Sequence, residues 1–154
     1  MLTNTRCFGT IDLDENKIIT FDQGIMGFEE YKKWALLYDM ESKEESSISW
    51  LQSLDEVSLA LPVVSPFCLV EEYNPVVEDE LLNGLGEFKD EDLIVLLALT
   101  VPEDAKKTTA NLKAPFILNP ETAKGIQVIV ENADYPVRFQ VYEAVQRRKE
   151  QRGE

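Results

Sequence analysis

The chain has 154 residues, of which 44% are hydrophobic and 29% charged, and it carries a formal net charge of −14 with no histidine. This is the size and balance of one globular domain, and no apolar run approaches the ~20 residues that a membrane helix needs. The negative charge opposes direct binding to nucleic acid or to anionic membranes, and the missing histidine removes the commonest general base and metal ligand.

The first part of the chain is predicted to form short β-strands. Alternating or continuous apolar patterns place five of them at residues 6–12, 17–21, 34–38, 48–52 and 57–63. Asp14, Glu15 and Asn16 are typical of a hairpin turn between the first two strands, and residues 41–47 form a polar loop. Pro62 lies inside the fifth strand, which indicates an edge strand, a bulge or an early end.

The second part of the chain adds three strands and the helical segments. Residues 93–101 are apolar on both faces, which predicts a central strand. Residues 116–118 and 126–130 are predicted to pair as a hairpin, with Gly125 ending the connection. Helical patterns occur at residues 28–33, 78–85 and 139–152. The sequence therefore predicts a mainly β fold, a small closed or partly open β-barrel-like domain with short helical segments.

A single β domain is expected over residues 1–143, followed by a basic, frayed tail at residues 144–154. The N-terminus has no apolar segment of the kind found in secretory signals. Cys7 and Cys68 lie far apart without CxxC spacing, which favours reduced cysteines in a cytoplasmic protein, although a disulfide between them stays open.

Acidic residues are concentrated in the middle of the chain. Residues 71–104 hold 11 acidic residues and one basic residue, whereas residues 105–154 hold six acidic and nine basic residues. An acidic surface attracts basic partner proteins and speeds their association at low salt. The alternative, that the acidity only keeps the protein soluble, has equal weight.

Three possible ion or phosphate sites do not meet their requirements. Residues 12–23 begin like a calcium loop, but Lys17 and Gln23 stand where Gly and Glu are needed. Gly24 and Gly27 lack the spacing of nucleotide-binding loops. The acidic run at 87–92 is typical of a solvated loop. We therefore expect no cofactor, no metal ion and no catalytic residue.

Three stretches of sequence go beyond composition. The first is ITFDQGIMGFE at residues 19–29, and the second is WLQS at 50–53 followed by LPVVSPF at 61–67. The third, from residue 100 to 138, includes TANLKAP at 109–115, KGIQ at 124–127 and YPVR at 135–138. In this order and spacing they resemble the family of the flagellar assembly factor FliW, over residues 5–143. The chain departs from that pattern at Asp22 and Met26, where the family often has Pro, and at Phe139, where relatives often have His.

The resemblance implies a small β-barrel-like fold and a regulatory protein rather than an enzyme. It implies two partners: flagellin, and CsrA, a small RNA-binding translational repressor. When flagellin is exported, the freed factor would capture the repressor, and flagellin messenger RNA would be translated.

The charge distribution suggests where the repressor would bind. An acidic surface beside a basic RNA-binding protein would repel RNA phosphates without covering the RNA site. We expect this surface to include an exposed Tyr73 as an apolar anchor, together with the acidic residues Glu71, Glu72, Glu78, Asp79 and Glu80.

Flagellin would be bound differently. Its chain ends are amphipathic helices, which favours a hydrophobic groove. Candidates are the apolar residues beside the glycines of the first motif, Phe21, Ile25 and Phe28, with burial of these side chains under the barrel mouth as an equally weighted alternative.

Two other classes of function remain open. One is an acidic nucleic-acid mimic that inhibits a different basic DNA- or RNA-binding protein. The other is an enzyme that uses carboxylates and a bound cation.

Overall fold

The structure is a computed structural model that describes residues 2–6, 8–38 and 48–151. Its strands are β1 Leu2–Thr5, β2 Gly9–Asp12, β3 Ile18–Thr20, β4 Lys33–Tyr38, β5 Ser49–Ser53, β6 Ala60–Val64, β7 Ile94–Thr100, β8 Thr109–Ala110, β9 Phe116–Asn119, β10 Lys124–Gln127 and β11 Phe139–Gln140. Its α-helices are α1 Asp79–Leu82 and α2 Val141–Gln151. Short 3-10 turns lie at η1 Glu15–Lys17, η2 Pro66–Cys68, η3 Asn83–Leu85, η4 Asp90–Asp92 and η5 Ala105–Lys107.

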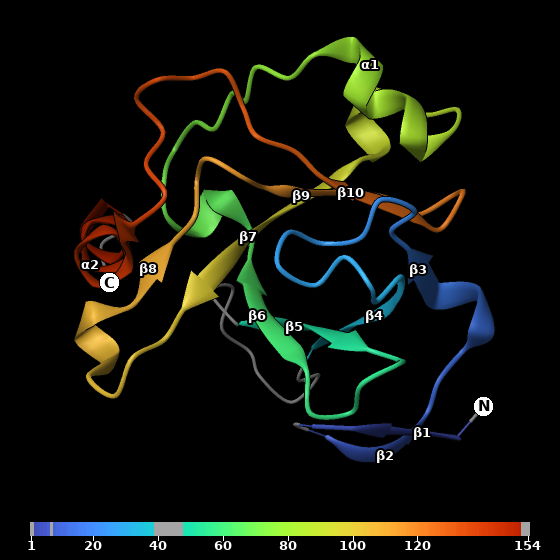
Figure 1. Ribbon diagram of the computed structural model, residues 1–154. Helices are drawn as coiled ribbons and strands as arrows, with labels where there is room; N and C mark the ends of the chain where they lie inside the picture. The colour runs from blue at the N-terminus through green and yellow to red at the C-terminus, as the bar shows by residue number, and fades with distance from the viewer. Residues whose placement is uncertain (1, 7, 39–47, 152–154) are drawn as a thin grey trace.

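Within the described residues, seven strands close into a barrel (Figure 1). Its strand order is β3, β4, β5, β6, β7, β9 and β10, and each strand is hydrogen-bonded to the next. The ring closes where Lys124 of β10 lies opposite Thr20 of β3, which is the parallel pair in an otherwise antiparallel barrel. The predicted mainly β, barrel-like fold is confirmed.

Large apolar side chains fill the barrel. Trp34, Leu51 and Phe116 are buried there, and the ring of Phe21 meets the ring of Phe116 edge-on with 6.2 Å between centroids. A Cβ atom on Gly125 would lie 2.6 Å from Cζ of Phe21. Gly125 is therefore required inside β10, where the aromatic ring packs on its backbone, and the prediction that it ends the hairpin connection is wrong.

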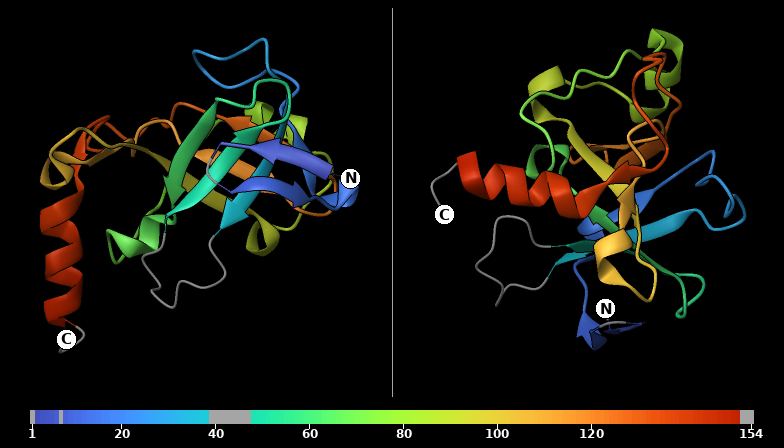
Figure 2. Two further views of the ribbon diagram at one scale, coloured as in Figure 1. Left: turned by 90° about the horizontal axis from the view of Figure 1, so that it is seen from below. Right: turned by 90° about the vertical axis from the view of Figure 1, so that its left-hand side faces the viewer.

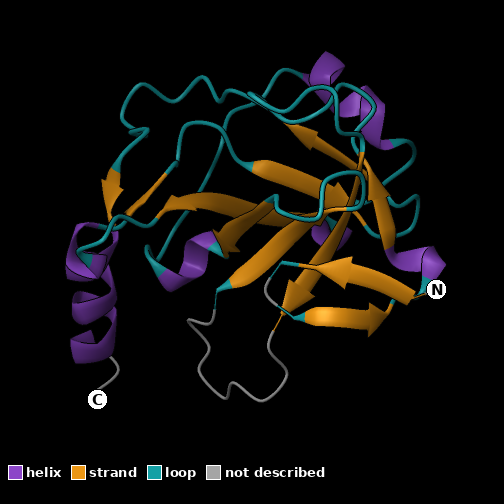
Figure 3. Ribbon diagram, turned by 60° about the horizontal axis from the view of Figure 1, so that its bottom comes forward, coloured by secondary structure: helices purple, strands orange, loops and turns teal. Residues whose placement is uncertain are grey.

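The N-terminal hairpin forms a separate two-stranded sheet of β1 and β2 (Figure 3). Its turn is stabilised by Thr5, whose hydroxyl donates to the carbonyl of Gly9 at 2.7 Å, and Gly9 adopts a positive φ of 65°. The predicted hairpin turn at residues 14–16 is wrong, since β2 pairs with β1 and not with β3. Asp14 instead caps η1 by accepting the backbone N–H of Asn16.

Most of the predicted strands of the barrel are present, with small shifts at their ends. β6 lies between β5 and β7, so it is not an edge strand. Its pairing with β7 begins at Val63, one residue after Pro62. Pro62, which has no backbone N–H, therefore lies just before the residues of β6 that pair with β7. The polar loop expected at 41–47 lies outside the described residues.

Two of the three predicted helical segments are helical. The pattern at 78–85 forms α1 and η3, which end at Gly86 with a φ of 74°. The pattern at 139–152 forms α2, which begins at Val141. The prediction for 28–33 is wrong, because these residues form separate turns in which Phe28 N–H donates to Ile25 and Tyr31 N–H to Phe28.

Helix α2 extends to one side of the barrel, next to β8 and β11 (Figures 1 and 2). Its first turns pack on a cluster outside the barrel, in which Ala144 is buried and Val141 and Val145 are partly buried. The helix crosses the expected boundary between residues 143 and 144 without a break. Of the helices described, none has the length and apolar character needed to cross a bilayer.

Candidate functional site

The backbone between η2 and α1 runs along the edge of the molecule (Figure 1), and we call the acidic surface along it the acidic ridge. We define it by five exposed carboxylates that the sequence predicted as partner-binding, Glu71, Glu72, Glu78, Asp79 and Glu80. Residues 72–77 between its two ends form neither helix nor strand. Along the chain, the carboxylates therefore fall into two groups, Glu71–Glu72 and Glu78–Glu80, at the two ends of this irregular segment.

The ridge is held by the neighbouring segment at residues 131–135. Asn132 accepts the N–H of Val76 through Oδ1 at 2.7 Å and donates through Nδ2 to the carbonyl of Asn74 at 3.0 Å. The hydroxyl of Tyr135 accepts the N–H of Asn74, and the N–H of Glu131 donates to the carbonyl of Val76. These bonds fix an otherwise irregular backbone. They also bring exposed Glu131 next to the ridge, an acidic residue that the sequence analysis did not include.

Tyr73 is buried, so the expectation that it is exposed in the loop is wrong. Its side chain is 7% exposed, stacks on the ring of Tyr135 with 4.9 Å between centroids, and donates its hydroxyl to the carbonyl of Leu112 at 2.7 Å. Burial raises the pKa of the Tyr73 hydroxyl, and Tyr135 adds to the effect. Tyr73 therefore anchors the ridge to the domain.

The three apolar candidates from the first motif lie at the end of the barrel. Phe21 and Ile25 are fully buried among the core residues, and Phe28 is partly buried against them. In Figure 1 their segment folds across the barrel opening. The expectation that Phe21 and Ile25 are exposed is wrong, and the alternative of burial under the barrel mouth is correct.

This segment is also tightly constrained. A Cβ atom on Gly24 would lie 2.5 Å from Cα of Glu29. The Glu29 carboxylate accepts the N–H of Gly27 at 3.1 Å. Hydrogen bonds from its own N–H and from Gly27 hold the pKa of this carboxyl below its usual value.

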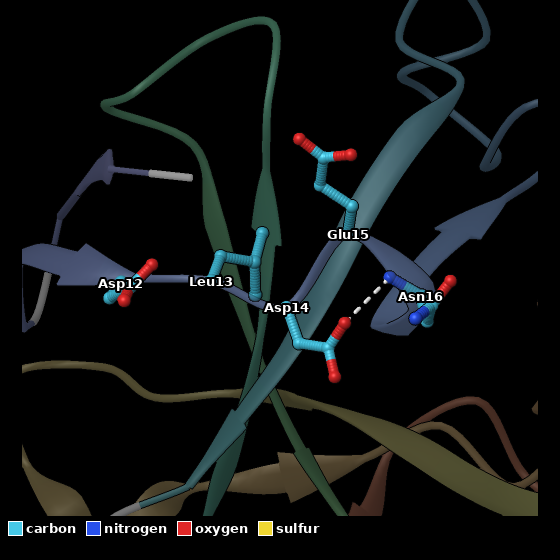
Figure 4. Close-up of a pocket in the computed structure, with 5 residues that line it drawn as sticks. All are labelled: Asp12, Leu13, Asp14, Glu15 and Asn16. Atoms are coloured by element: carbon cyan, nitrogen blue, oxygen red, sulfur yellow. Dashed lines mark hydrogen bonds between the residues drawn. The ribbon is translucent and has the colours of Figure 1, made fainter.

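Carboxylates also occur away from the ridge. A polar pocket of about 450 Å³ is lined by Asp12, Leu13, Asp14, Glu15 and Asn16, with Asp14 bonded to Asn16 inside it (Figure 4). Across the described part of the chain, no group of three or more histidine, cysteine or acidic residues is arranged to hold a metal ion. Acidity is therefore widespread on this surface, and the ridge is one dense part of it.

An apolar groove lies between the barrel and α2. It has a volume of about 340 Å³, and its walls come from β6, β7, the end of η2, the start of η5 and the first turns of α2. Its lining includes Cys68, Leu69, Val101 and Tyr142. Val101 is 50% exposed and Tyr142 is 44% exposed, so both leave apolar surface open to solvent beside the groove.

The rim of this groove carries a cation. The Lys106 ammonium lies 5.8 Å from the ring centroid of Tyr142, close enough for a cation–π contact. Exposed Lys107 follows it in η5, and the nearby carboxylate of Asp104 caps η5 by accepting the N–H of Lys106. On α2, Glu143 pairs with Arg147 at 3.7 Å.

A sequence model of the FliW protein family matches residues 2–141. A flagellar assembly factor FliW of Lachnoclostridium phytofermentans is 54% identical over the whole chain and 99% of the relative. The chain belongs to the FliW family. A FliW of Leptospira interrogans is 40% identical over 91% of the chain and 92% of the relative. The structure is also similar to a crystal structure of the flagellar assembly factor FliW, with a TM-score of 0.82 and 31% sequence identity. The match covers 92% of this chain and 97% of the chain in the crystal structure.

Polar residues in the FliW-like motifs form hydrogen bonds that stabilise the fold. Gln127 of the KGIQ stretch accepts the N–H of Met26 at 2.8 Å and donates to the carbonyl of Ala114 at 3.1 Å. Asn111 of the TANLKAP stretch accepts the N–H groups of Lys113 and Ala114, both at 3.0 Å. Gln127 therefore joins three of the FliW-like segments, whereas Asn111 stabilises a turn within its own segment, so the contribution of both residues here is to the fold.

Gln52 of the WLQS stretch has a similar position. It is 1% exposed, accepts the N–H of Arg6 at 2.9 Å, and donates to the carbonyls of Ser53, Val57 and Leu59. It thereby fastens the N-terminal hairpin and the β5–β6 connection to the barrel.

One residue that departs from the FliW pattern forms an ion pair. Asp22, which stands where the family often has Pro, pairs with Lys124 at 3.1 Å. Both side chains are well exposed, so this ion pair contributes little to stability.

The groove is the site that sequence reasoning missed. Its walls come from residues 48 to 145, and each short apolar stretch has the pattern of an ordinary core strand or helix. Val101 offers a weak signal, because it follows the apolar run of β7 directly before Pro102 and two acidic residues.

Proposed function

We propose that this chain binds flagellin and the translational repressor CsrA in turn, and that capture of CsrA relieves repression of flagellin translation. The observation that carries the proposal is membership of the FliW family over nearly the whole chain, with relatives named as flagellar assembly factors. The proposed role is regulatory and non-enzymatic.

The acidic ridge supports the repressor half of the proposal. An RNA-binding repressor must present Lys and Arg to phosphates, and the ridge offers exposed carboxylates on a backbone fixed by Asn132 and Tyr135. Two unit charges 10 Å apart interact by about 0.4 kcal/mol in water. Several such pairs give a coupling of about 1–3 kcal/mol, enough to disfavour bound RNA.

The proposal is tested by titrating the purified protein into a repressor–RNA complex, with and without flagellin monomer. RNA release is followed by fluorescence anisotropy of a labelled RNA. We expect release by the protein alone, and we expect flagellin added in excess to prevent it. If RNA stays bound at saturating protein, the proposed function is wrong.

A nucleic-acid mimic and a cation-dependent enzyme give different results. A mimic would recover another DNA- or RNA-binding protein from lysate, and would leave flagellin and the repressor behind. A cation-dependent enzyme would show a higher melting temperature with calcium, magnesium or manganese.

A further inference from the structure

We propose that the apolar groove between the barrel and α2 is where this protein binds an amphipathic helix that carries a carboxylate beside its apolar face. The inference rests on the proposed function, under which the occupant is a terminal helix of flagellin. It replaces the first-motif residues as the place for that helix, because Phe21 and Ile25 are buried in the core.

The size of the groove suits the apolar face of a helix. A volume of about 340 Å³ is at the lower end of ligand pockets, so it accommodates a few side chains and not a whole helix. Helices bound in grooves insert residues spaced three or four apart. Val101 and Tyr142 are exposed at this groove, so apolar area is available to cover without unfolding anything.

The positive charge at the rim of the groove favours a bound helix that carries a carboxylate next to its apolar face. Lys106 is held over Tyr142 at the edge of the groove. Two nearby carboxylates have partners of their own, since Asp104 caps η5 and Glu143 pairs with Arg147. A carboxylate on the helix, one turn from an inserted apolar residue, would therefore meet a cation next to an apolar surface, where a charge pair is screened less than in open solvent.

The groove adjoins the acidic ridge. Leu69 lines the groove, and the ridge begins two residues later at Glu71, a separation of at most about 7 Å along the chain. Both stand on the same apolar cluster, which contains Leu69 and Tyr73. A helix in the groove would thus lie against one end of the ridge, and direct obstruction would suffice for flagellin and the repressor to exclude each other.

The test measures the affinity of flagellin monomer by calorimetry at physiological salt. Val101→Asp places a charge in the groove, Tyr142→Ser removes its exposed ring, and Lys106→Glu reverses the rim charge. Matched controls are Val57→Asp, a valine of 46% exposure on the β5–β6 connection, and Lys33→Glu on β4. We expect each groove variant to bind at least ~10-fold more weakly, and each control to stay within about twofold.

A second measurement does not depend on variants of the groove. Cys68 lines it and is half-buried, so in a Cys7→Ser background we expect saturating flagellin to slow alkylation of Cys68 at least ~5-fold, since a bound helix covers the thiol. Groove variants that bind flagellin as wild type does, or unchanged alkylation with flagellin bound, would overturn the groove assignment while leaving the proposed function intact. If wild-type protein binds no flagellin at all, both proposals fail together.

Discussion

At position 125, glycine permits close packing against the ring of Phe21 in the barrel. A Cβ atom there would lie 2.6 Å from the ring of Phe21 and 2.9 Å from Leu118, both buried. We expect Gly125→Ala to lower the free energy of unfolding by about 1–3 kcal/mol, because a filled core must shift to admit it. Urea unfolding followed by tryptophan fluorescence measures this, since Trp34 is in the same cluster.

Gly84→Ala is the matched control for this substitution. The nearest atom to its new Cβ would be Cγ2 of Ile126 at 3.4 Å, an ordinary contact, and Gly84 does not have a positive φ. We expect a change between zero and a gain of about 1 kcal/mol. Equal losses at the two glycines would show that the Phe21 contact is not what requires Gly125.

Tyr73 makes the folded state sensitive to alkaline pH. Its hydroxyl donates to the buried carbonyl of Leu112, so we expect Tyr73→Phe to cost about 1–2 kcal/mol at pH 8. Because the folded pKa is raised, the contribution of the neutral hydroxyl is complete below the unfolded pKa near ~10 and is lost as the pH rises above it. The difference between wild type and variant should therefore shrink above pH 10, as measured by urea unfolding at pH 8 and pH 10.5.

The exposed Tyr142 supplies the control. Tyr142→Phe should change the free energy of unfolding by less than about 0.5 kcal/mol at either pH. A Tyr73→Phe variant whose deficit grows at pH 10.5 would contradict the assigned burial and its effect on the pKa.

The residue types around Tyr73 did not reveal whether its side chain is buried or exposed. Its neighbours Glu71, Glu72 and Asn74 are polar, as in a loop, so sequence favoured exposure. The deciding contacts are with Leu112 and Tyr135, 39 and 62 positions away, which no local pattern encodes. The acidic residues of the ridge were expected on the surface, because Asp and Glu side chains are seldom buried.

At the scale of elements, the N-terminal hairpin depends on one buried side chain. Gln52 of β5 accepts the N–H of Arg6 and donates to the carbonyls of Val57 and Leu59. We expect Gln52→Leu to lower the free energy of unfolding by about 2–3 kcal/mol, since several polar groups lose their partner. Hydrogen exchange should also quicken at the amide of Arg6.

The control is Gln140→Leu, at an exposed position of β11. It should leave exchange at Arg6 unchanged and stability within about 0.5 kcal/mol. If Gln52→Leu destabilised the protein without faster exchange at Arg6, the hairpin would not depend on this side chain.

Element prediction succeeded where a pattern is local and failed where pairing is distant. β4, β5, β7 and the β9–β10 hairpin follow from apolar runs and alternation. The partner of β2 does not, because a polar Asp-Glu-Asn sequence serves equally as a hairpin turn or as a capped 3-10 turn. The closure of β10 onto β3 joins residues more than 100 apart, so it is set by packing around Phe21 and not by either strand alone.

At the scale of the whole molecule, the uneven charge along the chain gives two adjoining surfaces a different net charge. The ridge belongs to the strongly acidic segment, whereas α2 and η5 belong to the net positive C-terminal part. The two surfaces adjoin at residues 69–71, on one apolar cluster. A basic partner would therefore meet an acidic surface, and a helix with an acidic flank would meet a neighbouring surface that is less negative.

The effect of the ridge can be separated from that of the overall charge by reversing carboxylates at two places. We expect the triple reversal Glu71→Lys, Glu72→Lys and Asp79→Lys to weaken repressor binding on the order of tenfold at physiological salt, about 1.4 kcal/mol. The control reverses three exposed carboxylates elsewhere, Glu30→Lys, Asp55→Lys and Glu121→Lys, with the same change in net charge. Binding is measured by calorimetry between 50 and 300 mM salt, roughly the range over which screening becomes effective.

The two triple variants distinguish a contact at the ridge from an effect of the net charge of the whole protein. If the ridge contacts the repressor, its reversal also flattens the salt dependence, because fewer close charge pairs remain to be screened, whereas the control loses less than about threefold in affinity. If the two variants weaken binding equally, only the net charge of −14 matters and the ridge is not the contact surface. Full affinity in the ridge variant would place the repressor contact on another face of the barrel.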